Sequence, residues 1–179
     1  YGIAKMLNFA HGDIIMVGAY AVITAVFTMG LPPFIAILIS IALCALLGIV
    51  IEFLAYRPLR QAQPLAVLIT AIGVSYLLQN LALLIYGSEQ KAFPTIVALP
   101  TVHIGGVYID GITLATLVVT AVIMVALSLF INKTRMGKAM RAVSEDMDAA
   151  ELMGISVNRT ITVTFAIGSA LAGIAAVFY

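Results

Sequence analysis

Residues 34–55 read FIAILISIALCALLGIVIEFLA, a run in which Glu52 is the only charged side chain. The hydrocarbon core of a bilayer is about 30 Å thick and a helix rises about 1.5 Å per residue, so roughly 20 apolar residues cross it. This run has that length and an apolar surface on every side. It predicts a transmembrane helix and therefore an integral membrane protein.

The rest of the chain repeats this pattern. Apolar segments of similar length lie at residues 65–86, 112–131 and 161–179, and a shorter one lies at residues 14–30. Open strands would leave unpaired backbone groups in lipid, and the alternation typical of barrel strands is absent from the sequence. We therefore predict an all-α fold, a polytopic transmembrane helical bundle of about five spans. Because the sequence starts without methionine and ends inside an apolar stretch, we expect residues 1–179 to be a single transmembrane domain, a fragment of a longer chain.

The composition agrees with a lipid environment. Hydrophobic residues make up 63% of the chain and charged residues only 9%, whereas a soluble domain carries about a quarter charged residues. A formal net charge of +1 gives no global basic field, which argues against a nucleic-acid partner. The single cysteine, Cys44, excludes an internal disulfide framework and is expected to be a small buried residue.

The basic residues predict the orientation of the bundle. Residues 56–64 carry two arginines, residues 132–160 carry five lysines or arginines, and residues 87–111 carry a single lysine, Lys91. Because positive charge is enriched in cytoplasmic loops, we place the first two connections in the cytoplasm and residues 87–111 in an extracytoplasmic loop. Strict alternation of the spans gives the same topology.

The predicted outer loop contains the sequence TVHIGGVYID at residues 101–110, in which β-prone runs flank Gly105 and Gly106. A glycine pair adopts the positive φ of a two-residue turn, so we predict a small extracytoplasmic β-hairpin. His103 has no second His, Cys or paired carboxylate at ligand spacing. We therefore expect a solvated strand residue there and no metal site.

The second basic loop contains signals for a short helix. Ser144 is a candidate N-cap, Glu145 and Asp146 would lie in the first turn, and Gly154 would stop the helix. The sequence therefore predicts a cytoplasmic helix over residues 145–153.

The stretch before this helix is amphipathic. Met136, Met140 and Val143 are spaced i, i+4 and i+7, with Lys138 and Arg141 on other faces. This pattern favours a helix lying along the membrane surface, and a surface helix with no partner stays an alternative.

Small residues follow one face of the span at residues 34–55. Ala36, Ser40, Cys44 and Gly48 recur every four residues and form a strip that permits close helix contact. Glu52 continues this strip. We expect it to be paired at the interface, although an acid within hydrocarbon would count as functional.

The segment at residues 65–86 is unusually polar for a membrane span, because small or polar side chains occupy two adjoining stripes: Thr70, Gly73, Ser75, Tyr76, Gln79 and Asn80. Two interpretations weigh equally. The side chains form modest hydrogen bonds between helices, worth about 0.6 kcal/mol each, or they line a hydrated pathway.

The sequence NFAHGD at residues 8–13 interrupts the apolar pattern before the first segment, and a polar seam follows it at Asp13, Tyr20, Thr24 and Thr28. Broken helices often mark transporter sites, because half-helix ends present partial charges to substrate. We favour a simpler role for Asp13 as the N-cap of the first span at the inner interface. Asn8 and His11 remain candidates for the pathway.

Enzyme motifs are absent from the sequence: there is no HExxH, no GxSxG and no pair of acids within a span. Gly137 and Lys138 resemble the end of a phosphate-binding loop. Asn132 stands where its first glycine should be, however, and Ala139 stands where Ser or Thr should be. We predict no enzymatic activity, no ATP-binding site and no cofactor.

Four stretches together resemble the branched-chain amino acid ABC transporter permease family: NFAHGDIIMVGAY, EFLAYRPLR, ITAIGVSYLLQN and RMGKAMRAVSEDMDAAELMGISVNRTITVTFAIGSALAG. The resemblance runs through nearly the whole chain in order. It implies a permease domain over residues 1–179 in a bacterial or archaeal plasma (inner) membrane. The implied partners are a second permease subunit, two ATP-binding subunits and an external or periplasmic substrate-binding protein.

The resemblance also implies that the region from Ala142 to Ile155, within the cytoplasmic coupling loop at residues 132–160, is the element that docks on the ATPase. The expected coupling residues are Arg141, Ser144, Glu145, Asp146, Ala149, Ala150, Leu152 and Gly154. The candidate pathway residues are Asn8, His11, Thr70, Ser75, Gln79 and Asn80. The expected function is import of branched-chain amino acids as small-molecule substrates. The alternatives are a urea or short-chain amide permease of the same family, a secondary transporter or channel, and a purely structural membrane subunit.

Overall fold

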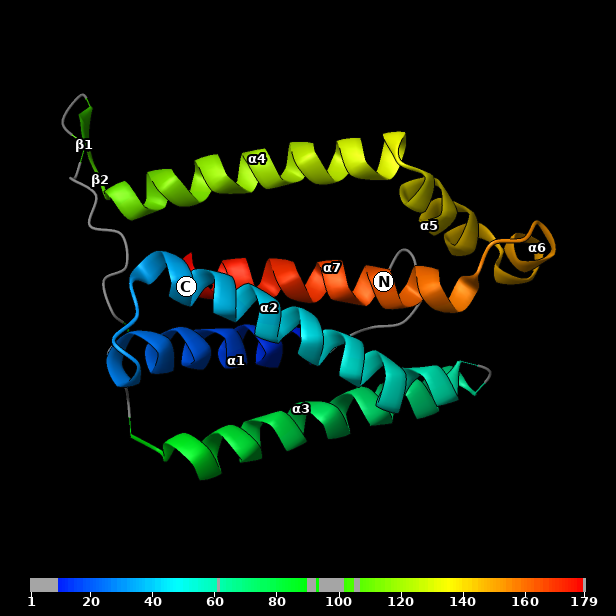
Figure 1. Cartoon of the computed structure of the whole chain (residues 1–179), viewed down its shortest axis with the longest axis horizontal. Helices are drawn as coiled ribbons and strands as arrows, with labels where there is room; N and C mark the ends of the chain where they lie inside the picture. Colours follow the sequence, from blue (N-terminus) through cyan, green and yellow to red (C-terminus); the bar gives the residue numbers. More distant parts are fainter. Residues whose placement is uncertain (1–9, 61, 90–92, 94–101, 105–106, 179) are drawn as a thin grey trace.

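The computed structural model describes residues 10–60, 62–89, 93, 102–104 and 107–178. Within these ranges, five helical stretches are long and apolar enough to cross a membrane: His11–Thr28, Pro33–Leu59, Leu65–Tyr86, Gly111–Lys133 and Val157–Phe178. They run side by side in alternating directions (Figure 1). The predicted helical bundle with five spans is confirmed.

The first two spans both change from α-helix to another helix type near their C-terminal ends. The first consists of α1 (His11–Ile23) and a π-helical turn, η1 (Thr24–Thr28). The second consists of α2 (Pro33–Ile51), a π-helical turn, η2 (Glu52–Tyr56), and a short 3₁₀ turn, η3 (Arg57–Leu59). The second span is therefore longer than its apolar run, and Glu52 lies inside it.

The other spans are continuous helices: α3 (Pro64–Tyr86), α4 (Gly111–Lys133) and α7 (Val157–Phe178). Prolines begin α2 and α3, where the fixed φ suits the first helical position and the missing N–H has no intrahelical acceptor. Gly87 ends α3 with a φ of 78°, a conformation that favours glycine.

The centre of the bundle is formed by α1, α2 and α7, which contact one another along their lengths. The predicted strip of small residues on α2 lies in this contact, because Ala36, Ser40, Cys44 and Gly48 are all buried. The hydroxyl of Ser40 donates to the carbonyl of Gly18 on α1 at 3.0 Å. The strip therefore brings α1 and α7 against α2, as its spacing predicted.

Glycines on α2 and α7 make this approach closer still. A Cβ atom added to Gly48 would overlap the side chain of Ser169 on α7. A Cβ atom added to Gly173 would lie 2.8 Å from the Cα atom of Ile41 on α2. Van der Waals packing of this kind is a principal force between helices in lipid, where lipid tails are as apolar as the helices themselves.

The two remaining spans lie at opposite edges of the bundle (Figure 1). Helix α3 contacts α1 and η2. Gly111 is the one buried residue of α4. The main contact of α4 is with the short helix α5 (Arg135–Glu145) that follows it.

Helix α5 packs onto the bundle, so the alternative of a surface helix with no partner is wrong. Met140 and Val143 are buried, and Val143 joins the same apolar cluster as Ile161 at the start of α7. Thr134 caps the helix by accepting a hydrogen bond from the Gly137 amide at 3.0 Å. The predicted amphipathic spacing is present, and its apolar face covers protein rather than lipid headgroups.

Two short strands lie in the run where the sequence predicts a hairpin. Strand β1 (Val102–Ile104) pairs antiparallel with β2 (Val107–Ile109), and His103 is opposite Tyr108 in the register. The glycine pair predicted to form the turn lies outside the described residues.

The Gly48 contact gives a stability prediction. Replacing Gly48 by alanine should lower the free energy of unfolding by about 1–3 kcal/mol, because the new methyl group overpacks the contact with Ser169. The measurement is denaturant titration of the purified protein in micelles. Gly168→Ala on α7 is the matched control, since an added Cβ meets nothing within 4 Å there. Equal unfolding free energies for the two variants would contradict close α2–α7 packing.

Candidate functional site

The first turn of α1 lies halfway along the neighbouring helices α2 and α3. The thiol of Cys44, near the middle of the second span, donates to the carbonyl of Ile14 in the first turn of α1 at 3.5 Å. On the other side, Asp13 contacts Ser75, which lies at the midpoint of α3. The first turn of α1 therefore lies at the middle depth of the bundle.

This position corrects the prediction for Asp13. The N-cap of α1 is Ala10, which makes no side-chain cap, and Asp13 is the third residue of the helix. Its carboxylate accepts hydrogen bonds from the Ser75 hydroxyl and from the Gln79 side-chain amide, the latter at 2.9 Å. Asp13 is only 8% exposed. Within the described residues, the His-Gly-Asp part of NFAHGD therefore forms the first turn of α1, with Asp13 buried against α3.

A second contact joins the first span and α3 toward their C-terminal ends. The rings of Tyr20 and Tyr86 stack with centroids 4.2 Å apart and planes inclined by 13°. The hydroxyls of Thr24 and Tyr86 are hydrogen bonded at 3.0 Å. Asp13, Tyr20 and Thr24 of the predicted polar seam thus all face α3.

A cleft of about 1030 Å³ runs between these two contacts. Gln79 lies on its wall beside the Asp13 contact, and Tyr20 lies at the tyrosine stack. Most of the remaining wall is apolar: Ile15, Met16, Ala19, Ile23, Ala82, Leu83 and Phe93. Gly12 also lines the cleft, and a Cβ atom added there would meet nothing within 4 Å. Gly87, Ser88 and Glu89 complete the lining, so polar and charged groups lie beside the apolar part of the wall.

The structure separates the candidate pathway residues. Gln79 lines the cleft, and its amide nitrogen donates to the Ser75 hydroxyl at 3.3 Å, whereas Ser75 itself is not a lining residue. Asn80 is exposed and donates to the Tyr76 carbonyl of its own helix at 2.7 Å. Thr70 is half-buried and does not line the cleft, and His11 is exposed at the start of α1. Asn8 lies outside the described residues.

The sequence analysis did not place Asp13 in the candidate site. Its partners lie more than 60 residues away along the chain. The signal available was the seam that Asp13 begins, because it shares one helix face with Tyr20 and Thr24.

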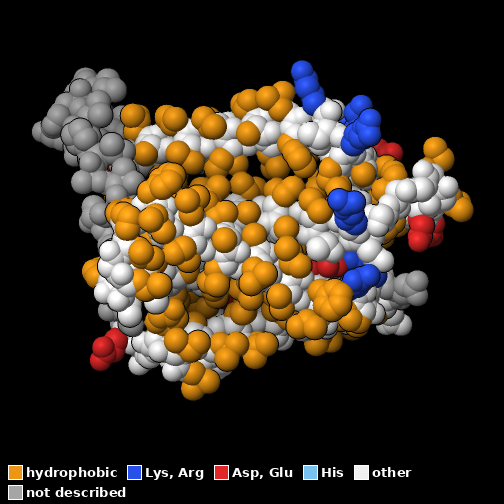
Figure 2. All heavy atoms as spheres, viewed as in Figure 1, with side chains coloured by type: hydrophobic (Ala, Val, Ile, Leu, Met, Phe, Trp, Pro, Cys, Tyr) orange, Lys and Arg blue, Asp and Glu red, His pale blue; other side chains and the backbone are white. Residues whose placement is uncertain are grey.

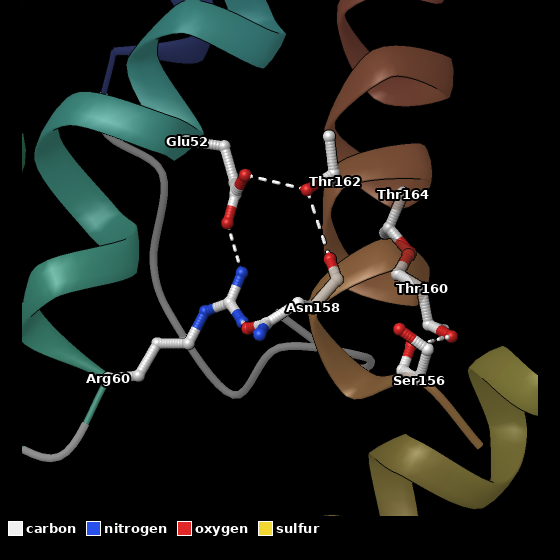
Figure 3. A network of polar contacts seen from close by, with 7 residues as sticks. All are labelled: Glu52, Arg60, Ser156, Asn158, Thr160, Thr162 and Thr164. Carbon is white, nitrogen blue, oxygen red and sulfur yellow. Dashed lines mark hydrogen bonds and ion pairs between the residues drawn. The ribbon is translucent and has the colours of Figure 1, made fainter. Parts of the chain in front are cut away.

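A buried ion pair, Glu52–Arg60, links the last turns of the second span to the first turns of α7 (Figure 3). Glu52 is fully buried, and its carboxylate accepts from the Arg60 guanidinium and, at 2.8 Å, from the Thr162 hydroxyl of α7. Arg60 also donates to the Asn158 side chain on α7. The predicted pairing of Glu52 is confirmed, although the acid lies within the span and not at its end. We call these four residues the inner clamp.

The loop between α5 and α7 contains a short helix, α6 (Met147–Leu152), whose cap differs from the prediction. Asp146 is the N-cap, and its carboxylate accepts from the amides of Asp148 and Ala149 at 3.0 Å each. Ser144 lies inside α5 and donates to the carbonyl of Arg141 at 2.6 Å. The prediction of Ser144 as the N-cap is therefore wrong, because α5 continues through it.

The other end of α6 is as predicted. Gly154 has a φ of 81°, and its amide donates to the carbonyl of Glu151 while the Ile155 amide donates to the carbonyl of Ala150. This pair of bonds forms a Schellman motif. The turn leaves Leu152 and Met153 at 90% and 83% exposure, whereas Ala150 is buried against the bundle.

The basic side chains lie at one end of the bundle. Every lysine and arginine in the described ranges lies at the end that carries η3, α5, α6 and the start of α7. Figure 2 shows this basic end beside a lateral surface covered by apolar side chains.

Comparison with known proteins gives the family. A family model described as "Branched-chain amino acid transport system / permease component" matches residues 1–179. A high-affinity branched-chain amino acid transport system permease protein, BraD of Pseudomonas aeruginosa, is 42% identical over 189 residues, covering 99% of this chain and 62% of the relative. LivH of Escherichia coli (strain K12), which has the same description, is 38% identical over 196 residues, covering 99% of this chain and 61% of the relative.

A probable branched-chain amino acid transport permease protein, LivH of Methanocaldococcus jannaschii, is 28% identical over 177 residues, covering 94% of this chain and 55% of the relative. The chain thus spans about three fifths of the length of the first two relatives. No solved structure matches it. The match of the family model to residues 1–179, together with the bacterial relatives, shows that this chain belongs to the branched-chain amino acid transport permease family.

Proposed function

We propose that the chain is the membrane-spanning part of a permease subunit in an ATP-binding cassette importer for branched-chain amino acids. It would lie in the plasma membrane of a bacterium or archaeon. A second permease subunit, two ATP-binding subunits and an external substrate-binding protein would complete the assembly. Family membership and the names of the relatives support this proposal.

The proposed coupling role rests on the exposed tip of α6, which consists of Leu152 at the end of the helix and Met153 just after it. Leu152 and Met153 are among the most exposed large apolar side chains of the described residues, and they lie at the basic end of the bundle. Two apolar side chains held out by a capped turn favour a protein partner, because exposed apolar surface is costly in water. An ATP-binding subunit is the partner that the proposed function supplies.

The inner clamp would pass movement from this tip into the bundle. Helix α7 begins shortly after Gly154, and Asn158 and Thr162 near its start both bind the Glu52–Arg60 pair. A displacement of α6 would therefore reach the inner end of α2 through side-chain contacts. The cleft between α1 and α3, with Gln79 on its wall, would form part of the substrate pathway.

The orientation of the bundle is testable by cysteine labelling. In a Cys44→Ala background, Asp110→Cys should react with an impermeant maleimide in intact cells, whereas Lys138→Cys should react only after permeabilisation. The reason is the excess of positive charge at the end that carries Lys138. Both positions are exposed, so access to solvent is matched. Reaction of Lys138→Cys in intact cells would reverse the orientation.

The coupling role is tested by changing the α6 tip. In the complete importer, Leu152→Asp combined with Met153→Asp should abolish co-purification of the ATP-binding subunits, because the apolar contact becomes charged. Membrane insertion of the permease should persist. Glu151→Gln, on the same turn, is the control and should retain the ATP-binding subunits. Unchanged co-purification and unchanged substrate-stimulated ATP hydrolysis in the double variant would show that α6 is only a linker.

The inner clamp gives a second stability prediction. Arg60→Met should lower the free energy of unfolding by about 3–5 kcal/mol, because it leaves the buried Glu52 carboxylate without its cation. Arg57→Met is the control: Arg57 is exposed and lies over the Phe53 ring at 5.2 Å, so its loss should cost about 1 kcal/mol or less. Adding Glu52→Gln to Arg60→Met should recover much of the loss. Equal losses for the two arginines in denaturant titration would exclude a buried pair.

A further inference from the structure

The joint between α4 and α5 concentrates positive charge with no acid beside it in the chain. Lys133, Arg135 and Lys138 are all exposed there, and we call these three residues the basic corner. Residues 111–144 contain no aspartate or glutamate. Within the described part of the chain, no residue of the basic corner forms an ion pair. Its positive charge is therefore not balanced by the side chains around it.

The packing of the joint keeps these charges together. The Thr134 hydroxyl donates to the Phe130 carbonyl at 2.7 Å and accepts from the Gly137 amide at 3.0 Å, so it bonds both helices. Arg135 and Lys138 are three residues apart on α5, which makes them neighbours on the helix surface. Like charges at this spacing repel one another. The basic corner is thus favourable only where an anion lies beside it.

An exposed apolar stripe on α4 leads to the basic corner. Val118, Val122, Val125 and Leu129 recur at intervals of three or four residues, the spacing of one helix face, and each is more than half exposed. Lys133 follows Leu129 by four residues and ends the same stripe. Figure 2 shows basic side chains beside the apolar surface at this end of α4. A hydrocarbon chain lying along the stripe would bring its headgroup to Lys133.

An anionic phospholipid has the chemistry that matches both parts of this surface. Lysine and arginine side chains next to the end of a span attract anionic headgroups, and they donate charge-assisted hydrogen bonds to phosphate oxygens. The apolar stripe suits an acyl chain, which a soluble anion or an acidic protein surface does not have. A zwitterionic headgroup carries its own cation and gains less from the basic corner.

The other arginines at this end of the bundle differ from the basic corner. Arg60 belongs to the inner clamp, and Arg141 donates to the Asn132 side chain at 3.1 Å. Arg57 and Arg159 are exposed but lie on other elements, η3 and α7. These two arginines therefore provide a control with the same charge at the same end of the bundle.

We propose that the basic corner and the apolar stripe of α4 form a binding site for an anionic phospholipid. Lys133, Arg135 and Lys138 hold the phosphate of the headgroup, and an acyl chain lies along the stripe from Leu129 toward Val118. The site requires only that the chain lies in a membrane. It goes beyond the proposed import function and does not depend on the transported substrate.

The test measures lipid binding to the purified complete importer by native mass spectrometry. Phosphatidylglycerol and phosphatidylcholine with identical acyl chains are titrated in parallel. Phosphatidylglycerol should bind about 10-fold more tightly or better, because several basic residues attract its headgroup. Water-soluble glycerol 3-phosphate should not displace it, since it has no acyl chain. Equal affinities for the two lipids, or displacement by glycerol 3-phosphate, would overturn the proposal.

Variants then locate the site. Arg135→Gln combined with Lys138→Gln should weaken phosphatidylglycerol binding by about 10- to 30-fold, since each basic residue at a membrane surface contributes a factor of about 5. Phosphatidylcholine binding should not change. Arg57→Gln combined with Arg159→Gln removes the same charge outside the basic corner and should change the affinity for phosphatidylglycerol by about 2-fold or less. Equal losses in the two double variants would show a general attraction to the basic end and overturn the site.

A single variant and an assembly measurement complete the test. Lys133→Gln should weaken phosphatidylglycerol binding by about 5-fold, and it decides the question if the double variant does not assemble. Co-purification of the ATP-binding subunits shows assembly and should persist in Arg135→Gln with Lys138→Gln. Loss of these subunits with normal phosphatidylglycerol binding would make the basic corner a protein contact and overturn the proposal. Lipid binding is measured without substrate, so failure of the proposed import function would leave this result unchanged.

Discussion

Close contact between helices in lipid depends on small side chains, and the strip on α2 provides them on the surface where α1 and α7 meet it. Lipid tails compete with apolar side chains for every contact, so burial of apolar surface alone does not hold spans together. The positions of Ser40 and Gly48 instead let backbones approach and let a hydroxyl bond a carbonyl of the next helix. This packing holds the first turn of α1 level with Cys44 of the second span.

The two polar sites follow from that central contact. With α1 fixed against α2, its first turn is held at the middle of the span, and the Asp13 carboxylate accepts hydrogen bonds from two side chains of α3. With α7 fixed against α2, the Glu52 carboxylate lies against Thr162 and is closed from the other side by Arg60 (Figure 3). Each acid is buried because the helices are close, and each is tolerated because the neighbouring span supplies donors.

The sequence predicted the parts of the fold that depend on local composition. Span lengths and the strip on α2 are set by residues near one another in the chain, so hydropathy and spacing were enough for them. The start of α1 was not predictable in this way, because Asp13 would suit an N-cap at an interface as well as a buried position opposite Ser75. Ser144 and Asp146 posed a similar ambiguity: both are good caps, and the choice depends on α5 continuing through Ser144 to complete its packing on α7. Ser75 and Asn80 differ in role for the same reason, since only contacts with α1 distinguish the faces of α3.

The turn between α4 and α5 has a mechanical consequence. At Gly137 the first turn of α5 lies against the backbone of Ile131 and Phe130, where a Cβ atom would overlap main-chain atoms, and Thr134 bonds both helices at once. A joint this tightly filled has little freedom to bend, so α4 and α5 behave as one cranked rod. Because α4 has few other contacts among the described residues, a tilt of α5 would carry the whole of α4 with it, and the end of α4 at Gly111 would move furthest.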